Sequence, residues 1–385
     1  MAIRAGERTV TADAYRRDTA TWVTFAALFA FGLMNAMLGP VLPFLRQSEH
    51  ISYLVAVLHQ VAFAIGGMVA GLLATRSSAP RRRTIIVGLV GAAIASLLLG
   101  YGGVLPATIV AALLVSGFAT AALIRMWALL ADLHLAHRAV AMTEGEIAVS
   151  LAGIVMPALI GLCAATSITW RFSTVIAFTF VVAAAIAVGL VRTPATGAEA
   201  RTDLPLRETS GRPLRTLTTI FAVVALEFTL SFWAASYLHD NVGIDRGTSV
   251  ALVSMLYAAN LVGRLLTSRI ARRMRAGVVL WLCLAAAFAG LPFLLSATSL
   301  GMAAVGLAVT GIGIGGTFPL ASAQHVEASG RSADQALGQI LAVGGVGQIV
   351  GPLAAGAVAQ VVDLRYGLLV LPVLVVVAAA TTRPT

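Results

Sequence analysis

Charged residues are scarce in this chain of 385 residues, and lysine is missing altogether. Only 11% of the residues are charged and 59% are hydrophobic, whereas a soluble domain usually carries about 25% charged residues. No fold in water could hide so much apolar surface in a chain of this length. The composition therefore excludes an ordinary soluble protein and indicates a lipid environment.

The 26 basic residues are all arginines, and they stand in short clusters between apolar runs. They do not form the continuous basic surface of a nucleic-acid-binding protein, so no nucleic-acid partner is expected. The only two cysteines, Cys163 and Cys283, both lie in apolar runs, and no disulfide framework is predicted. The absence of lysine is typical of a GC-rich genome, which points to a bacterial origin.

Twelve apolar runs are long enough to cross a bilayer, whose hydrocarbon core of about 30 Å needs roughly 20 helical residues. The first six are residues 21–44, 51–74, 84–103, 107–130, 139–165 and 172–191. The second six are residues 217–238, 249–268, 276–295, 300–321, 337–361 and 366–380, of which the last is short. We therefore predict an all-α membrane protein with 12 transmembrane helices.

The arginines also set the orientation, because cytoplasmic loops carry the excess of positive charge. With the N-terminus in the cytoplasm, the outer side receives only Arg46, Arg171, Arg246 and Arg365, while Arg125 lies inside a span. The remaining arginines then face the cytoplasm. We expect a multi-pass protein of the bacterial plasma (inner) membrane with both termini in the cytoplasm.

One long polar segment, residues 192–215, separates the spans into two groups of six. It contains proline, glycine, threonine and charges of both signs, which is typical of a flexible linker. The predicted organisation is a cytoplasmic segment at 1–20, a six-helix bundle at 21–191, a cytoplasmic linker at 192–215 and a second bundle at 216–382.

Several sequence features that are typical of other protein classes are not found. The polar N-terminal region lacks the short apolar core of a cleaved signal peptide. No Walker loop is present, so ATP is not expected to drive the protein. Asp132, His134 and His137 lie close together, but no further His or Cys accompanies them, so neither a metal site nor another cofactor is predicted.

The two groups of spans resemble each other. A shift of 197 positions places residues 71–76 on residues 268–273 and Gly66 on Gly263. Duplicated six-helix units are known in transporters, with the binding site between the halves near the middle of the membrane. Chance matches among glycine, alanine and arginine are the alternative explanation.

The loop after the second span carries a family motif. Residues 71–76 read Gly-Leu-Leu-Ala-Thr-Arg and resemble the Gly-x-Leu-Ala-Asp-Arg pattern of the major facilitator superfamily, with Thr75 in place of the aspartate. The resemblance extends over essentially the whole chain and implies two pseudo-symmetric six-helix bundles. It also implies a conformational loop motif formed by Gly71 and Arg76 in one half and by Arg272 and Arg273 in the other.

Glycine and proline motifs in three spans are also similar to those of this family. They lie at residues 38–43, 347–356 and 153–161. In some exporters of the family, a motif of this kind in the fifth span is associated with antiport. Close helix packing and a bend explain the same residues equally well.

Glu227 lies near the middle of the seventh span among apolar residues. An ionisable group in a bilayer is costly unless it is paired or neutralised, so it is a functional candidate by default. Desolvation favours the neutral carboxyl group, which would allow Glu227 to exchange a proton near neutral pH. The functional interpretation is a proton-coupling or substrate-binding carboxylate, and the structural alternative is a hydrogen bond to another helix.

Arg125 and Glu146 lie at similar depth on the antiparallel fourth and fifth spans. Each is about ten residues from the connecting loop, or roughly 15 Å at the rise of an α-helix. They could form a buried pair, for which Glu144 is the competing carboxylate. Such a pair could be structural, could act as a gate or proton relay, or could leave Arg125 to bind an anionic substrate.

Uncharged polar residues near the middle of several spans complete the candidate site. They are Asn35, His59, Gln60, Tyr257, Asn260 and Gln348. Each one alone is more often a hydrogen bond between helices than a ligand contact. As a group drawn from both halves, they predict a polar central cavity.

Together these features predict a secondary active transporter of a small organic solute that works by alternating access and is coupled to protons. The thinly charged interior slightly favours efflux of a drug-like or amphipathic metabolite. The alternative is a proton symporter for a sugar-like or organic-acid solute. We expect no enzyme, because the buried ionisable residues are scattered over both halves. A membrane-embedded enzyme or a channel is the alternative of another class, but nothing in the sequence requires the repeated polar or small lining of a channel. The expected partners are the solute, protons and the lipid bilayer, and the protein is expected to be a monomer.

Overall fold

The computed structural model describes residues 15–74, 79–166, 169–191, 213–329 and 333–382, and within these ranges the chain forms helices and no strands. Twelve of its helical segments are long and apolar enough to cross a membrane. The predicted number of spans is therefore confirmed. The greater part of the expected linker, together with Arg76, lies outside the described residues.

The first six spans contain seven α-helices. They are α1 (Thr19–Asn35), α2 (Leu38–Glu49), α3 (Tyr53–Ala74), α4 (Arg81–Tyr101), α5 (Leu105–Leu133), α6 (Arg138–Ala165) and α7 (Phe172–Leu190), with a short 3-10 turn, η1 (Leu135–His137), before α6. α1 and α2 together make one span, Thr19–Glu49. This span continues beyond the predicted end at residue 44, because polar residues extend the helix past its apolar part.

The second six spans contain eight helices. They are α8 (Pro213–Asp240), α9 (Arg246–Ile270), α10 (Ala276–Leu295), α11 (Leu300–Gly315), α12 (Thr317–Ser329), α13 (Ala333–Val361), α14 (Leu364–Gly367) and α15 (Val370–Thr381). The tenth span joins α11 to α12, and the twelfth joins α14 to α15. The tenth span therefore runs well beyond residue 321, where its apolar run ends.

Each interrupted span breaks about four residues before a proline. α1 ends before Ala36, α11 ends at Gly315 and α14 ends before Leu368, and Pro40, Pro319 and Pro372 follow at the next helical turn. Proline cannot donate the hydrogen bond to the carbonyl four residues earlier, and its ring collides with that carbonyl. The chain therefore starts a new helix in which the proline is the third residue.

Each group of helices contains an equivalent close contact between two of its helices, which supports the internal repeat. A Cβ atom on Gly66 of α3 would lie 2.1 Å from the carbonyl oxygen of Leu113 in α5. A Cβ atom on Gly263 of α9 would lie 2.1 Å from the carbonyl oxygen of Ile312 in α11. The matched glycines thus allow equivalent helix pairs to approach at backbone distance.

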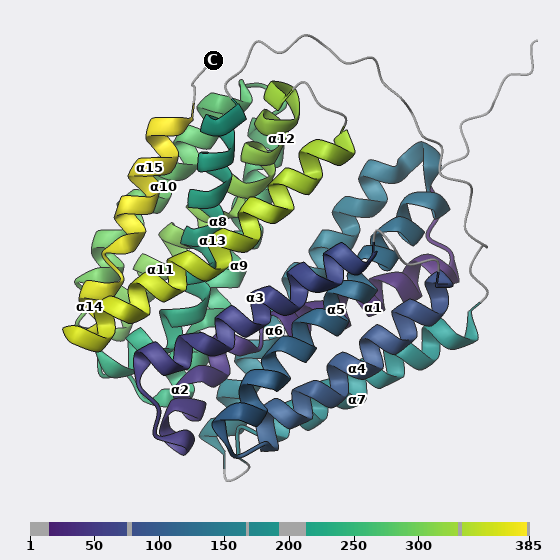
Figure 1. Ribbon diagram of the computed structural model, residues 1–385. Helices are drawn as coiled ribbons and strands as arrows, with labels where there is room; N and C mark the ends of the chain where they lie inside the picture. Colours follow the sequence, from purple (N-terminus) through teal and green to yellow (C-terminus); the bar gives the residue numbers. More distant parts are fainter. Residues whose placement is uncertain (1–14, 75–78, 167–168, 192–212, 330–332, 383–385) are drawn as a thin grey trace, which may run out of the picture.

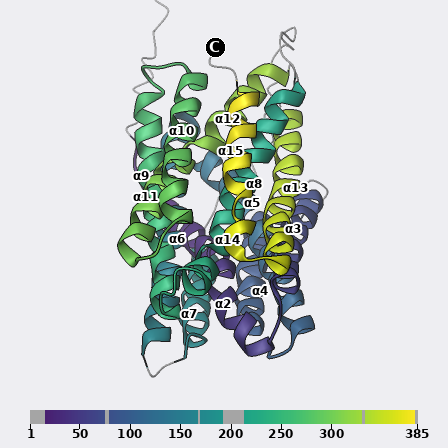
Figure 2. The ribbon, with the colours of Figure 1, turned by 90° about the vertical axis from the view of Figure 1, so that its left-hand side faces the viewer.

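The helices α1–α7 form one group and α8–α15 the other, as Figure 1 shows. We call the end at which α7 ends at Leu190 and α8 begins at Pro213 the linker end, and the opposite end, at which α2 and α8 finish, the Asp240 end. The groups diverge toward the linker end (Figure 1). They meet where α3 packs on α13, α6 on α9 and α2 on α8, and Figure 2 shows the second group from its outer side.

Candidate functional site

A cavity of about 60 Å³ lies between the two groups of helices. Four of the polar residues that the sequence singled out line it, namely Asn35, Gln60, Glu227 and Tyr257. The other lining residues are Leu38, Gly39, Phe63, Phe228, Ser231 and Phe232. The cavity therefore combines amide and carboxyl groups with three phenylalanine rings.

The break between α1 and α2 shapes one wall of this cavity. Asn35 is the last residue of α1, and Leu38 and Gly39 begin α2. A Cβ atom on Gly39 would lie 2.2 Å from the carbonyl oxygen of Ser231 in α8, so only glycine allows this approach between the groups. An interrupted helix at a central site is a common arrangement in transporters.

Glu227 enters the cavity from the middle of α8 and has a polar partner on α9. The side-chain amide of Asn260 donates a hydrogen bond to Glu227 Oε1 at 3.2 Å. Tyr257, Asn260 and Arg264 follow one another at helical spacing, so they share one face of α9. That face turns toward Glu227 and toward the first group of helices.

A charged bridge joins the two groups on the linker side of the cavity. Arg264 of α9 donates to Glu146 of α6, with 3.0 Å between Nη1 and Oε2. Glu227 interacts electrostatically with both Arg264 and Glu146. The Arg264 guanidinium is thus paired with Glu146 of the other half and also exerts an electrostatic effect on Glu227 of its own half.

The partner of Glu146 differs from the one that the sequence suggested. Arg125 instead directs Nη2 to the carbonyl oxygen of Ala74, the last residue of α3, at 3.4 Å. The estimate of depth along α5 and α6 ignored rotation about the helix axes, and Glu146 faces α9. Glu144, the competing carboxylate, lies near the linker end of α6 and binds Arg17 and Tyr15 at 2.5 and 2.7 Å.

Two further candidates, His59 and Gln348, form hydrogen bonds within and between helices and do not line the cavity. His59 is fully buried, and its ring nitrogens contact the carbonyl oxygen of Ala56 at 3.1 Å and the hydroxyl of Thr108 at 3.0 Å. It therefore faces α5 rather than the cavity, one residue away from the cavity-lining Gln60. Gln348 contributes its backbone carbonyl, which lies 3.5 Å from Gln60 Nε2.

The expected loop motif is described only in part. Gly71 lies in α3, where an added Cβ atom would meet nothing within 4 Å. Arg272 and Arg273 are exposed in the turn after α9. Arg76 is not among the described residues.

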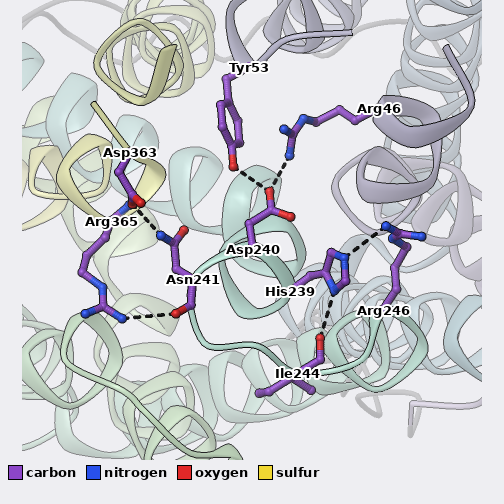
Figure 3. Close-up of polar contacts among 9 residues, drawn as sticks. All are labelled: Arg46, Tyr53, His239, Asp240, Asn241, Ile244, Arg246, Asp363 and Arg365. Carbon is purple, nitrogen blue, oxygen red and sulfur yellow. Dashed lines mark hydrogen bonds and ion pairs between the residues drawn. The ribbon is translucent and has the colours of Figure 1, made fainter. Parts of the chain in front are cut away.

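A polar network joins the two groups at the Asp240 end, and its residues are not among those predicted from the sequence. Asp240 of α8 accepts hydrogen bonds from Arg46 Nη1 at 2.5 Å and from the Tyr53 hydroxyl at 2.7 Å, both of which come from the first group (Figure 3). The Arg46 guanidinium lies 3.7 Å from the centre of the Tyr53 ring. Arg246 of α9 adds a hydrogen bond to Gln47. We call Arg46, Tyr53 and Asp240 the outer lock.

One feature of the sequence could have revealed the outer lock. Arg46 and Arg246 are two of the four arginines on the side that otherwise carries little positive charge. A cation that departs from the general charge bias needs a local partner, and the acidic residues at the same end of neighbouring spans were the available ones.

Comparison with known proteins gives the family. The family model of the Major Facilitator Superfamily matches residues 24–343, whereas no curated protein sequence matches the chain. Among solved structures, a bacterial homolog of the human lysosomal transporter Spinster, inward-facing and unoccupied, is 16% identical, with a TM-score of 0.70 over 95% of this chain and 97% of that chain.

Two other solved transporters have the same fold. The nucleoside transporter NupG is 13% identical, with a TM-score of 0.74 over 94% of this chain and 98% of that chain. The D-xylose-proton symporter is 12% identical, with a TM-score of 0.71 over 94% and 96%. The family match over most of the chain, together with twelve spans in two related groups, establishes that this protein belongs to the major facilitator superfamily of secondary transporters.

Proposed function

We propose that this transporter couples the movement of a small organic solute to protons, with Glu227 as the proton-binding carboxyl group. The observation that carries the proposal is the position of Glu227, which lines the cavity between the halves and interacts with the Arg264–Glu146 bridge. A carboxyl group at this place lies at the junction of the two halves, where binding of a proton can act on both.

The bridge suggests how proton binding would act on the conformation. A proton on Glu227 removes the attraction of this residue for Arg264, which leaves Glu146 as the main partner of the guanidinium. The ion pair between α6 and α9 then strengthens, and loss of the proton weakens it again. Because this pair joins the halves on the linker side of the cavity, the protonation of Glu227 biases the equilibrium between their arrangements.

We infer that the described arrangement opens toward the cytoplasm. The hydrogen bonds of the outer lock and of Arg246 hold the halves together at the Asp240 end, whereas the helices diverge toward the linker end (Figure 1). The arginine distribution assigns the linker end to the cytoplasm. Reporter fusions within residues 192–215 test this assignment, and an external location would contradict it.

The lining of the cavity favours an amphipathic solute. Phe63, Phe228 and Phe232 offer apolar contacts, and Glu227 offers one acidic group. Export of such a solute in exchange for protons is therefore the first candidate. The amide groups of Asn35 and Gln60 favour the second candidate, which is proton-driven uptake of a sugar-like or organic-acid solute.

Flux measurements in proteoliposomes test the proposal. A thermal-shift screen of the purified protein would first identify a solute, and its flux would then be followed with and without a pH gradient. We expect saturable flux that is driven uphill by the gradient. Glu227→Gln, which resembles the protonated residue, should abolish uphill movement and leave solute exchange intact.

Glu144→Gln is the matched control, because it removes a carboxylate from α6 that does not line the cavity. It should retain gradient-driven flux. Accumulation that stays unchanged in Glu227→Gln would remove this residue from the coupling role. An ion current that needs no solute would instead indicate a channel.

A further inference from the structure

A second cavity lies on the outer surface of the C-terminal half, between α10 and the junction of α14 with α15. Its volume is about 450 Å³, within the range of roughly 300–1,000 Å³ that is usual for small-molecule sites. Its lining is largely apolar and includes Phe288, Leu295 and Leu369. Phe288 and Leu369 are 45% and 48% exposed, so the cavity is a groove that opens toward the surrounding lipid.

The groove follows from the broken twelfth span. α14 ends at Gly367 and α15 begins at Val370, because Pro372 cannot continue the helix. α10 and α15 pack against each other, and they lie side by side in Figures 1 and 2. The groove is lined from both sides of the interruption, by Tyr366 of α14 and Pro372 of α15.

Polar groups lie at one end of the groove only. Ser296 follows the last residue of α10, and Arg365 and Tyr366 belong to α14, so all three lie at the Asp240 end of their spans. Tyr366 is 56% exposed. Tyrosines and arginines at the ends of spans are typical of the interface between hydrocarbon and headgroups.

The positive charge of Arg365 lies at this end of the groove and is not used in an ion pair with another described residue. Its Nη2 atom donates to the carbonyl oxygens of Asn241 at 3.3 Å and Ala297 at 3.4 Å, and Figure 3 shows the other terminal guanidinium nitrogen directed away from Asn241. The nearby Asp363 accepts hydrogen bonds from Asn241 and from the backbone of Arg365.

We propose that this groove binds an anionic phospholipid, with an acyl chain along Phe288 and Leu369 and the phosphate at Arg365 and Tyr366. An arginine that carries no ion pair forms strong, charge-assisted hydrogen bonds with phosphate oxygens. The apolar groove adds a contact that only a ligand with a hydrocarbon chain can make. The direction of the groove, polar at the membrane surface and apolar inward, matches the direction of a lipid in the bilayer.

Native mass spectrometry of the purified full-length protein tests the proposal. The protein would be incubated with phosphatidylglycerol or with phosphatidylcholine of the same acyl chains. We expect roughly fivefold greater retention of phosphatidylglycerol, which is the effect of about one arginine at an anionic headgroup. Arg365→Gln should remove this preference, and Leu369→Trp, which fills the groove, should remove the retained lipid.

Leu282→Trp is the matched control, because Leu282 is a 51% exposed residue of α10 that does not line the groove. It should bind phosphatidylglycerol like the wild type. Equal retention of both lipids, retention that survives Leu369→Trp, or displacement of the lipid by an equal concentration of inorganic phosphate would each overturn the proposal. If Arg365→Gln does not fold, the two tryptophan variants decide.

Discussion

At Gly39, the backbones of the two halves come into direct contact. A Cβ atom there would lie 2.2 Å from the carbonyl oxygen of Ser231, so Gly39→Ala must push α2 away from α8. We expect the variant to populate arrangements in which the Asp240 end is open. A cysteine at Asn35 would then react faster with a membrane-impermeant thiol reagent added from outside.

Gly301→Ala is the control for this substitution, because a Cβ atom on Gly301 of α11 meets nothing within 4 Å. The buried native cysteines Cys163 and Cys283 should contribute little background labelling. Equal labelling of the Gly39→Ala and Gly301→Ala variants would show that the contact does not limit opening.

The Arg264–Glu146 bridge makes a prediction about coupled residues. Arg264→Gln leaves Glu227 and Glu146 without their shared cation, so we expect a larger loss of gradient-driven flux than from Glu146→Gln. The double variant should be little worse than Arg264→Gln alone, because residues in one ion-pair network act non-additively. Additive losses in a double-mutant cycle would contradict a functional pair.

The residues of the candidate site differ in how easily they can be predicted from the sequence. Glu227 is conspicuous because it interrupts an apolar run, and the structure places Asn35, Gln60 and Tyr257 around the same cavity. Arg264 was not recognised, because it lies near the end of its apolar run and resembles the other arginines that the charge distribution assigns to the cytoplasm. His59 shows the reverse error, since depth in a span does not reveal which way a side chain faces.

At the scale of elements, Asp245 caps the N-terminus of α9 and allows a test of a helix cap. Its carboxylate accepts the backbone N–H of Thr248 at 3.0 Å, and hydrogen bonds from the side chain and backbone of Thr248 hold the pKa of Asp245 below its ordinary value. Asp245→Ala should lower the stability by about 1 kcal/mol. Thermal unfolding in detergent at neutral pH measures this loss.

The pH dependence of this cap follows from the lowered pKa. A group with a depressed folded-state pKa contributes stability above its unfolded value of about 3.9 and loses it as the pH falls through the folded value. The difference between the wild type and Asp245→Ala should therefore narrow as the pH falls below about 4, through the lowered pKa of Asp245. Asp245→Asn keeps an uncharged cap, so its melting temperature should lack this component of the pH dependence.

The helices could be predicted from the sequence, but their interruptions could be predicted only in part. Twelve apolar runs correspond to twelve spans, because length and hydrophobicity are sufficient to specify a membrane helix. Prolines were visible as possible bends, but only some of them end a helix. Pro157 and Pro352 lie inside the uninterrupted helices α6 and α13, whereas Pro319 and Pro372 each lie one turn after an interruption.

At the scale of the whole molecule, the outer lock should control the equilibrium between the halves. Asp240 is the common acceptor for Arg46 and Tyr53, and hydrogen bonds to a charged group contribute about 1.5–3 kcal/mol each. Asp240→Asn should therefore shift the population toward arrangements open at the Asp240 end by roughly tenfold. Pulsed electron paramagnetic resonance between spin labels on α2 and α9 would measure the change in distance.

Asp363→Asn is the matched control, because Asp363 lies at the same end but, within the described part of the chain, its hydrogen bonds join it to Asn241 and Arg365 of its own half. An identical distance distribution for Asp240→Asn and the wild type would exclude the outer lock as a determinant of the conformation. The two-bundle architecture could be anticipated from the repeat, but the arrangement of the bundles could not, because it depends on contacts between residues that are 118 to 288 positions apart.

Because the outer lock lies at one end of the spans, we expect its ion pair to respond to salt on that side of the membrane only. Arg46 and Asp240 lie close to the ends of their spans, and their side chains are 18% and 25% exposed. Dissolved ions weaken the attraction between exposed charges over a distance of about 10 Å at 0.1 M salt. Salt added to one compartment of sealed vesicles should loosen the lock, and the same salt in the other compartment should not. The rate of transport would then depend on the side of the bilayer to which the salt is added.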